Sequence, residues 1–257
     1  MFDKTLKYYN DILKELFEYV LRKYDVNLNN TVLCRPKSGA DLRFPSDEYA
    51  LLRGPEILLT CEYRDGIGQV FTTAPRSFRG RLRDVLSLDL NYIRNASIFH
   101  AVMNAVLKHL GLIDKSEHCS GEEPKLCGYA LYIELLSKYG QDFKVLHVGY
   151  QPSHIEHLSK LLHDNLVVTD LDERLVWSIK YGRPVIDGLL NKYLIHHADI
   201  VLLTASSIVN NTAWEVLNHA YMLRKEIVIY GVSASAAIYL LNNSGILKVK
   251  HFCPYAK

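Results

Sequence analysis

The chain has no long hydrophobic run, no strong excess of one charge and no paired CxxC motif. No apolar run reaches the roughly 18 residues that a membrane-spanning helix needs. The amino terminus carries acidic residues and a helical pattern in place of a signal peptide. A formal net charge of +2 gives no general attraction to nucleic acid or to an anionic membrane. These absences predict a cytoplasmic protein that binds neither nucleic acid nor membrane.

The common catalytic and nucleotide-binding motifs are also missing. The sequence contains no serine hydrolase elbow, Walker loop, His-Glu-x-x-His helix or full glycine-rich dinucleotide loop. Its five cysteines are an odd number, which favours reduced thiols or metal ligands over a disulfide framework. With 49% hydrophobic residues over 257 positions, the chain can bury one large core or two modest ones, and the patterns below favour two.

Residues 1–115 have the pattern of a small α+β domain. Apolar side chains recur at spacings of three and four from Phe2 to Tyr24, as on one face of an amphipathic helix. Between two strand-like runs, Arg64-Asp65-Gly66 predicts a tight hairpin turn in which Asp-Gly supplies the positive φ. The predicted elements are a helix at 2–24, strands at 31–34, 56–63 and 67–73, and helices at 82–86 and 96–110.

Residues 116–257 form the second predicted domain, which begins with a polar linker at 116–128 and then alternates between strand-like and helix-like segments. The predicted strands are 143–149, 166–170, 199–204 and 226–230, and the predicted helices are 129–139, 153–163, 212–223 and 234–241. Alternation with short connections predicts a Rossmann-like parallel sheet with helices on both faces. The predicted fold class is therefore α/β.

The candidate binding residues follow the predicted strands, because a ligand of an open parallel sheet lies beyond the carboxyl ends of its strands. Asp170 ends the second strand about 20 residues after Gly149, which suits a ribose, and a helix cap is the alternative. The loop from Thr204 to Thr212 is dense in hydroxyl and amide groups that suit a ligand or, alternatively, helix caps and turns. Pro152 leaves fewer backbone donors for an anion. The predicted ligand-binding residues here are Gly149, Asp170, Asp172, Thr204, Ser206, Ser207, Asn210, Asn211, Thr212 and Ser233.

Three cysteines are candidate metal ligands, namely Cys119, Cys127 and Cys253. Thiolates together with imidazoles suit zinc, copper and other soft metals. The alternative is that these side chains are small buried hydrophobic residues. Cys34 and Cys61 lie in strand-like runs and have no assigned role.

The histidines offer weaker patterns. His147 lies within an apolar strand and is predicted to be a satisfied core residue. His154 and His157 stand at helical spacing and could present two imidazoles on one face, but the sequence supplies no third ligand near them.

Several segments resemble a known family. The segments KVLHVGYQP, VTDLDE and ADIVLLTASSIVNNTAWEVL, with the terminal YGVSASAAIYLLNNSGILKVKHFCPYA, are similar to proteins grouped as putative heavy-metal chelation proteins, from residue 116 to the end. The resemblance implies an enolase-like amino-terminal domain, a Rossmann-like carboxyl-terminal domain and a site between them that includes Asn104. Two glycines of the family's motifs are replaced here by Ala205 and Asn211, which restricts close backbone approach to a ligand.

Three functional hypotheses follow. The first is a protein that binds a metal or a small metal chelate, with a transition metal as the bound ion. The second is an enzyme with a nucleotide-type cofactor, NAD or S-adenosylmethionine, and the missing glycine-rich loop weakens it. The third is a non-catalytic regulatory domain. The amphipathic first helix and the many tyrosines are compatible with a homodimer.

Overall fold

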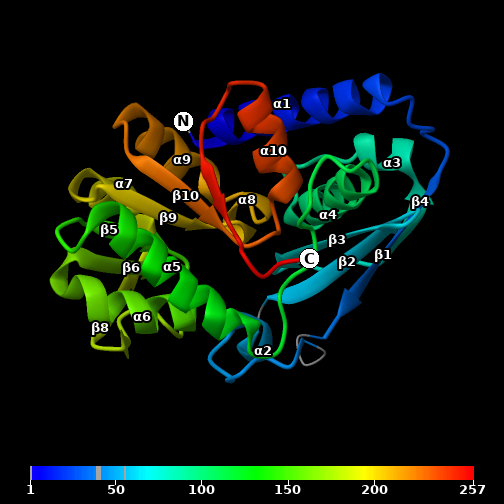
Figure 1. The fold of residues 1–257 in the computed structure, drawn as a ribbon. Coiled ribbons are helices and arrows are strands. Elements are labelled where there is room, and N and C mark those ends of the chain that lie inside the picture. The colour runs from blue at the N-terminus through cyan, green and yellow to red at the C-terminus, as the bar shows by residue number, and fades with distance from the viewer. Residues whose placement is uncertain (1, 39–41, 55) are drawn as a thin grey trace.

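The computed structural model describes residues 2–38, 42–54 and 56–257, and it contains two sheets (Figure 1). The smaller sheet is antiparallel, with the strand order β3-β2-β1-β4. Its strands are β1 (Thr31–Lys37), β2 (Ile57–Tyr63), β3 (Gly66–Thr72) and β4 (Phe78–Arg81). The helices of this half are α1 (Phe2–Lys23), α2 (Ala50–Arg53), α3 (Leu82–Leu86) and α4 (Ile93–His109). The elements predicted in this half are confirmed, whereas β4 and α2 were not predicted.

Helix α4 lies directly on β3, and two glycines make this contact possible. A Cβ atom on Gly66 would lie 2.1 Å from the Ala105 carbonyl oxygen, and one on Gly68 would lie 2.1 Å from that of Ala101. The prediction that Asp-Gly supplies the positive φ of the hairpin turn is wrong, because Arg64 has that conformation, with φ of 52°. Gly66 is needed where a strand passes close to a helix.

The larger sheet has the strand order β11-β10-β9-β5-β6-β8-β7. Its strands are β5 (Val145–Val148), β6 (Leu166–Asp170), β7 (Ile179–Lys180), β8 (Arg183–Asp187), β9 (Ile200–Thr204), β10 (Glu226–Tyr230) and β11 (Lys250–Phe252). All neighbouring strands are parallel except β7, which pairs antiparallel with β8 at one edge. Counted along the chain, the parallel strands have the order 3-2-1-4-5-6, so the topological switch lies between β5 and β9. The predicted α/β class with a parallel sheet is confirmed, although β7, β8 and β11 were not predicted.

Helices cover both faces of the larger sheet. Those of this half are α5 (Glu123–Tyr139), α6 (Pro152–Leu162), α7 (Asn191–Leu194), α8 (Ser206–Val209), α9 (Ala213–Met222) and α10 (Ser235–Asn243). Leu146 and Val148 of β5 pack in the apolar cluster with α9 and α10, whereas Val145 packs in the cluster with α5 and α6. This alternation is the period of two that a strand imposes on its side chains. Helix α5 begins at Glu123, inside the segment predicted to be a linker, so Cys127 is helical.

The two halves share one apolar cluster. Helices α1 and α4 from the first half pack in the same cluster as α9 and α10 from the second. Tyr9 of α1 stacks on Trp214 of α9, with ring centroids 4.6 Å apart and planes 9° from parallel. Figure 1 shows α1 and α10 side by side. The core therefore crosses the predicted boundary at residue 115, so the halves cannot move apart without exposing apolar surface.

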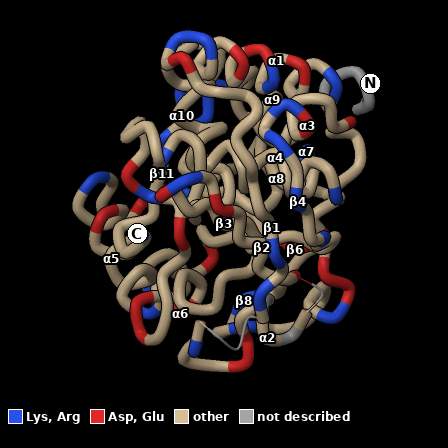
Figure 2. The backbone as a smooth tube through the Cα atoms, turned by 90° about the vertical axis from the view of Figure 1, so that its right-hand side faces the viewer, with Lys and Arg blue, Asp and Glu red and all other residues tan. Residues whose placement is uncertain are grey.

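Charged residues of both signs are interspersed along the backbone in the view of Figure 2, as the small net charge leads one to expect. None of the helices in the described ranges combines the length and the hydrophobicity that crossing a bilayer requires.

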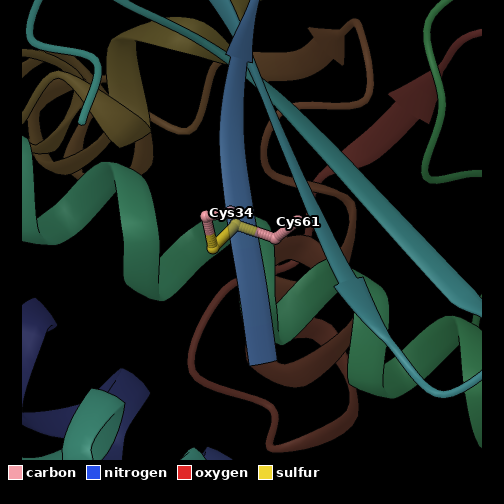
Figure 3. Close-up of a disulfide and its surroundings, with 2 residues drawn as sticks. All are labelled: Cys34 and Cys61. Carbon is pink, nitrogen blue, oxygen red and sulfur yellow. A yellow bond between two sulfur atoms is a disulfide. The ribbon is translucent and has the colours of Figure 1, made fainter. Parts of the chain in front are cut away.

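Cys34 and Cys61 form a disulfide between β1 and β2 (Figure 3). The two residues are direct partners in the antiparallel register, with Cα atoms 4.0 Å apart, and both are fully buried. The expectation of reduced thiols is therefore wrong for this pair, because strand pairing brings together two residues that are 27 positions apart in sequence. The thiols of Cys119, Cys127 and Cys253 are free.

We predict that the paired substitutions Cys34→Ala and Cys61→Ala lower the free energy of unfolding by about 3.5 kcal/mol, the chain-entropy value for a closed loop of this length. Urea unfolding with and without dithiothreitol measures the effect. The reductant should destabilise the wild-type protein and leave the double variant unchanged. Equal midpoints for wild type and variant under oxidising conditions would contradict the prediction.

His100 is a polar residue of α4 that lies inside the apolar core. Its side chain is fully buried, and neither ring nitrogen has a hydrogen-bond partner within the described parts of the chain. Burial alone lowers the pKa of His100 from 6.5 to about 4, because the charged imidazolium would lose its hydration. His100 is therefore neutral in the folded protein at neutral pH.

The lowered pKa of His100 predicts a loss of stability in acid. Between pH 6.5 and about 4 the unfolded chain binds a proton that the folded chain does not, so stability falls as pH falls. We predict that His100→Leu removes about 2 kcal/mol of the stability difference between roughly pH 7.5 and 5. Urea unfolding of both proteins at the two pH values measures it, and identical pH dependence would show that His100 does not contribute.

Candidate functional site

A cavity of about 970 Å³ lies at the carboxyl ends of the parallel strands. Segments that follow each of the six parallel strands line it. The first half of the chain supplies another part of the wall, including Phe44, Tyr49, Glu56, Phe71 and Thr73. This volume is at the upper end of the range for small-molecule and cofactor sites. The cavity is the candidate functional site.

Asp170 organises the turn after β5. Its carboxylate accepts a hydrogen bond from the backbone N-H of Tyr150 at 2.6 Å and another from that of Asp172 at 2.8 Å. Gly149 has φ of 90°, and a Cβ atom there would lie 2.7 Å from Cγ2 of Thr204. Gly149, Asp170 and Asp172 all line the cavity, as predicted. Both oxygens of Asp170 already hold backbone groups, so its first role is to shape the crevice.

The amino terminus of α6 is already capped. The side chain of Gln151 accepts a hydrogen bond from the backbone N-H of His154 at 2.5 Å, and Pro152 occupies the first turn without an N-H. A pyrophosphate in a dinucleotide site needs free donors at this helix end. The end of α6 therefore offers little to a phosphate.

The loop after β9 supplies most of the cavity's hydroxyl groups. The Oγ atoms of Thr204 and Ser206 lie 3.0 Å apart, and Ser207 Oγ donates to the Thr204 carbonyl at 2.5 Å. The residues of this loop that line the cavity are Thr204, Ala205, Ser206, Ser207, Asn210 and Thr212. These side chains therefore lie where the sequence analysis placed them.

Asn211 has a structural role instead of the predicted binding role. It is buried, and its Nδ2 donates to the Leu90 carbonyl at 2.7 Å, which ties the loop to the first half of the chain. Its φ of 60° lies in the left-handed region, which asparagine tolerates better than most residues. This conformation explains how Asn211 can replace a glycine of the family motif.

Asn104 also does not fit its predicted ligand role. Its side chain is fully buried. Its Nδ2 lies within 3.1 to 3.3 Å of the carbonyl oxygens of Gln69, Val232 and Ser233, and its Oδ1 accepts from the Ala236 N-H at 2.9 Å. The amide of Asn104 joins α4, β3 and the loop after β10, so its function is structural.

Ser233 and His118 meet where the two halves contact each other. Ser233 Oγ accepts a hydrogen bond from the backbone N-H of Phe71 at 3.0 Å and lies 3.3 Å from Nε2 of His118. The imidazole of His118 stacks on the ring of Phe71, with centroids 3.7 Å apart. Burial lowers the pKa of His118 to about 3, so the ring is neutral. Phe71 and His118 give the cavity a flat aromatic surface that the sequence did not indicate.

The three free cysteines, Cys119, Cys127 and Cys253, line the same cavity, which the sequence alone did not indicate. Burial, and then repulsion between neighbouring thiolates, raises the pKa of Cys119 to about 12. Burial raises the pKa of Cys253 to about 11. In residues 2–38, 42–54 and 56–257, no group of three or more His, Cys, Asp or Glu side chains is arranged to hold a metal ion. A closed metal site is therefore not preformed there.

The charged groups that line the cavity are mainly acidic. The acidic residues are Glu56, Asp170, Asp172, Glu173 and Glu215, and the basic residues are Arg174 and Lys192. Arg174 pairs with Asp172 at 2.8 Å, which neutralises one charge of each sign. The remaining lining favours a cationic ligand over an anionic one.

A segment before α2 completes the wall in a way that the sequence did not reveal. Glu48 accepts a hydrogen bond from the Tyr150 hydroxyl at 2.8 Å and pairs with Lys180 at 2.6 Å. Arg174 also donates to the Gly54 carbonyl. These contacts join residues more than 100 positions apart, so local sequence patterns contain no signal for them.

We predict that Asn104→Leu lowers the free energy of unfolding by about 3 kcal/mol, because it leaves buried backbone groups without partners. Urea unfolding measures this effect, and the matched control is Asn95→Leu, at a half-buried position of the same helix where the amide donates one hydrogen bond to the Asp89 carbonyl. A loss below about 1 kcal/mol, the value of one ordinary hydrogen bond, would show that the amide of Asn104 does not join the two halves.

Comparisons with known proteins agree with this fold. A family model described as putative heavy-metal chelation matches residues 132–253. A comparison with curated proteins finds no match. The chain is similar to a solved DUF364 protein of unknown function from Pyrococcus horikoshii, with 18% identity, a TM-score of 0.52, and coverage of 86% of this chain and 79% of that one. A second DUF364 structure, from Desulfitobacterium hafniense, has 19% identity, a TM-score of 0.44 and 73% coverage of each chain.

The first of these likenesses shows a shared fold. The resemblance found in the sequence is confirmed, because the model of the family described as putative heavy-metal chelation matches residues 132–253.

Proposed function

We propose that the protein binds a small metal chelate in the cavity between its two halves. The observation that carries this proposal is the composition of a single cavity of about 970 Å³, which combines three free thiols with a mainly acidic lining. Thiols and carboxylates can bind a metal at a coordination position that the organic ligand of the chelate leaves open. The family description supports the same class of ligand.

A chelate fits the cavity better than a bare ion does. A structural metal site closes around the ion with about four protein ligands, and such a site needs no large space. Here the described residues offer no group of three such ligands, whereas the cavity has room for an organic molecule. A metal that arrives with its own organic ligands needs only one or two protein atoms.

S-adenosylmethionine is a second candidate, and NAD is disfavoured. The cap on α6 and the acidic lining both oppose a pyrophosphate. S-adenosylmethionine carries a sulfonium cation and no phosphate, so the acidic lining suits it. Asp170 stands at the end of the second parallel strand, where a carboxylate can bind ribose.

Thermal unfolding with a ligand panel tests the proposal. The panel contains the one-to-one histidine complexes of Zn²⁺ and Ni²⁺, which are cationic, the Fe³⁺ citrate complex, the free metals, histidine alone, S-adenosylmethionine and NAD. We expect the cationic histidine complexes to stabilise the protein, by about 2.7 kcal/mol at a concentration of 100 times the dissociation constant. Histidine alone and the anionic complex should have little effect.

A charge variant then locates the binding. Glu215 lines the cavity, so Glu215→Gln should weaken binding of the histidine complexes by about fivefold, whereas Glu62→Gln on β2 should not. Isothermal titration measures both. Stabilisation by free metals alone, equal in all variants, would contradict the chelate proposal, and stabilisation by S-adenosylmethionine alone would favour the second candidate.

A further inference from the structure

A thiol and two imidazoles form a hydrogen-bonded relay at one end of the cavity. Cys127 of α5 lies with its Sγ 3.6 Å from Nε2 of His154, in the first turn of α6. Nδ1 of His154 lies 3.2 Å from Nε2 of His147 in β5. Cys127 and His154 line the cavity, and His147 is fully buried. We call these three residues the Cys127 relay.

Burying the two imidazoles of the Cys127 relay costs desolvation free energy. His147 and His154 lie in the apolar layer under α5 and α6, with ring centroids 4.9 and 4.8 Å from that of Tyr230. Nδ1 of His147 is buried and has no hydrogen-bond partner among the described residues. The prediction that His147 is a satisfied core residue is therefore only half correct. Apolar side chains would fill this space without the desolvation cost of two imidazoles, so packing does not account for the relay.

Close contact between α5 and α6 fixes the distance between Cys127 and His154. A Cβ atom on Gly128 would lie 2.4 Å from the Ser153 carbonyl oxygen, so only glycine permits the backbones to approach this closely. Ser153 Oγ also donates to the Lys125 carbonyl at 3.1 Å. Gly128 and Ser153 are the chain neighbours of Cys127 and His154, and the geometry of the pair is therefore set by rigid helices.

We infer that Cys127 is a nucleophile, and His154 its proton acceptor, for acyl transfer from an ester or thioester in the cavity. A nucleophile hydrogen-bonded to a base that a third group orients is the arrangement that this chemistry requires. The mechanism requires the tautomer of His154 whose Nδ1-H donates to Nε2 of His147, because Nε2 of His154 is then the acceptor that faces Sγ of Cys127. His147 is thus a positioning residue. This activity uses the same cavity as the proposed function but requires no metal.

Each step of the reaction balances. The Sγ-H proton passes to Nε2 of His154 while a bond forms between Sγ and the carbonyl carbon of the substrate. The bond from that carbon to the leaving oxygen or sulfur then breaks, and His154 returns the proton to the leaving group. Water attacks the enzyme thioester with His154 again accepting a proton, which releases the acid and restores the Cys127 thiol. The net reaction is hydrolysis of the ester or thioester.

The other free cysteines are built-in controls. Cys119 and Cys253 line the same cavity, but among the described cysteines only Cys127 has an Sγ hydrogen-bonded to an imidazole. A reagent that enters the cavity meets all three thiols. Selective acylation of Cys127 would therefore show that the relay, and not accessibility alone, determines which thiol reacts.

The probe is p-nitrophenyl acetate, an activated ester that releases coloured p-nitrophenolate. We expect a rapid burst of p-nitrophenolate with wild-type protein and, by peptide mass mapping, one acetyl group on Cys127. Cys127→Ala should abolish the burst, His154→Gln should slow it by about 100-fold, and Glu62→Gln, on β2 and outside the cavity lining, should leave it unchanged. His147→Asn should lower the acylation rate at saturating probe without changing the half-saturating concentration.

The wild-type map alone can overturn the inference, even if a variant fails to fold. Acetyl groups spread over Cys119, Cys127 and Cys253, or located only on lysines, would exclude a selective nucleophile. An unchanged rate in a folded His154→Gln protein would exclude the base. A negative result in this test would not contradict the proposal of chelate binding, because the stabilisation by histidine complexes is measured without any reaction at Cys127.

Discussion

The amide of Asn104 is the interaction on which the rest of the arrangement depends. It projects from α4, and it binds backbone groups of β3, of the loop after β10 and of the first turn of α10. Gly68 lets β3 come within contact of the same helix turn, so the amide can reach both sides. Because a buried amide must keep its partners, the two sheets are held in one relative position. The cavity that they enclose is therefore a fixed feature of the fold.

The topology of the larger sheet decides which residues face that cavity. The switch between β5 and β9 leaves a crevice, and Gly149 and Thr204 approach closely across it. Asp170 holds the turn on one side with its carboxylate, and the hydroxyls of the loop after β9 cover the other. The carboxylate of Asp170, which the sequence predicted to be a ligand, accepts two backbone hydrogen bonds that shape the crevice. Under the chelate proposal, recognition then depends on other residues that line the cavity, such as Ser206 and Glu215.

The sequence predicts the features of the fold that depend on local patterns. It does not predict those that depend on contacts between distant segments of the chain. Apolar runs and turn residues were enough for the parallel sheet and for the position of Asp170 at a strand end. The strand β8 has the sequence Arg-Pro-Val-Ile-Asp, whose polar ends hide its pairing with β6. The Cys34 disulfide and the relay depend on contacts between segments far apart in the chain, so spacing alone contains no signal for them. The sequence likewise contains no signal for the left-handed φ of Asn211 or for the hydrogen bond that its side chain donates to the Leu90 carbonyl.

Cys127 cannot act as nucleophile and metal ligand at the same time. A metal takes a thiolate, and burial together with the neighbouring thiols raises the pKa of Cys127 far above its usual value, so metal binding must expel a proton. The relay works with the neutral thiol, because His154 removes the proton only as the new bond forms. Burial therefore favours the neutral pair in the empty cavity, whereas a chelate that engages Cys127 would block acyl transfer. Under the two proposals, Cys127 could therefore serve either chemistry, and the ligand that occupies the cavity would select between them.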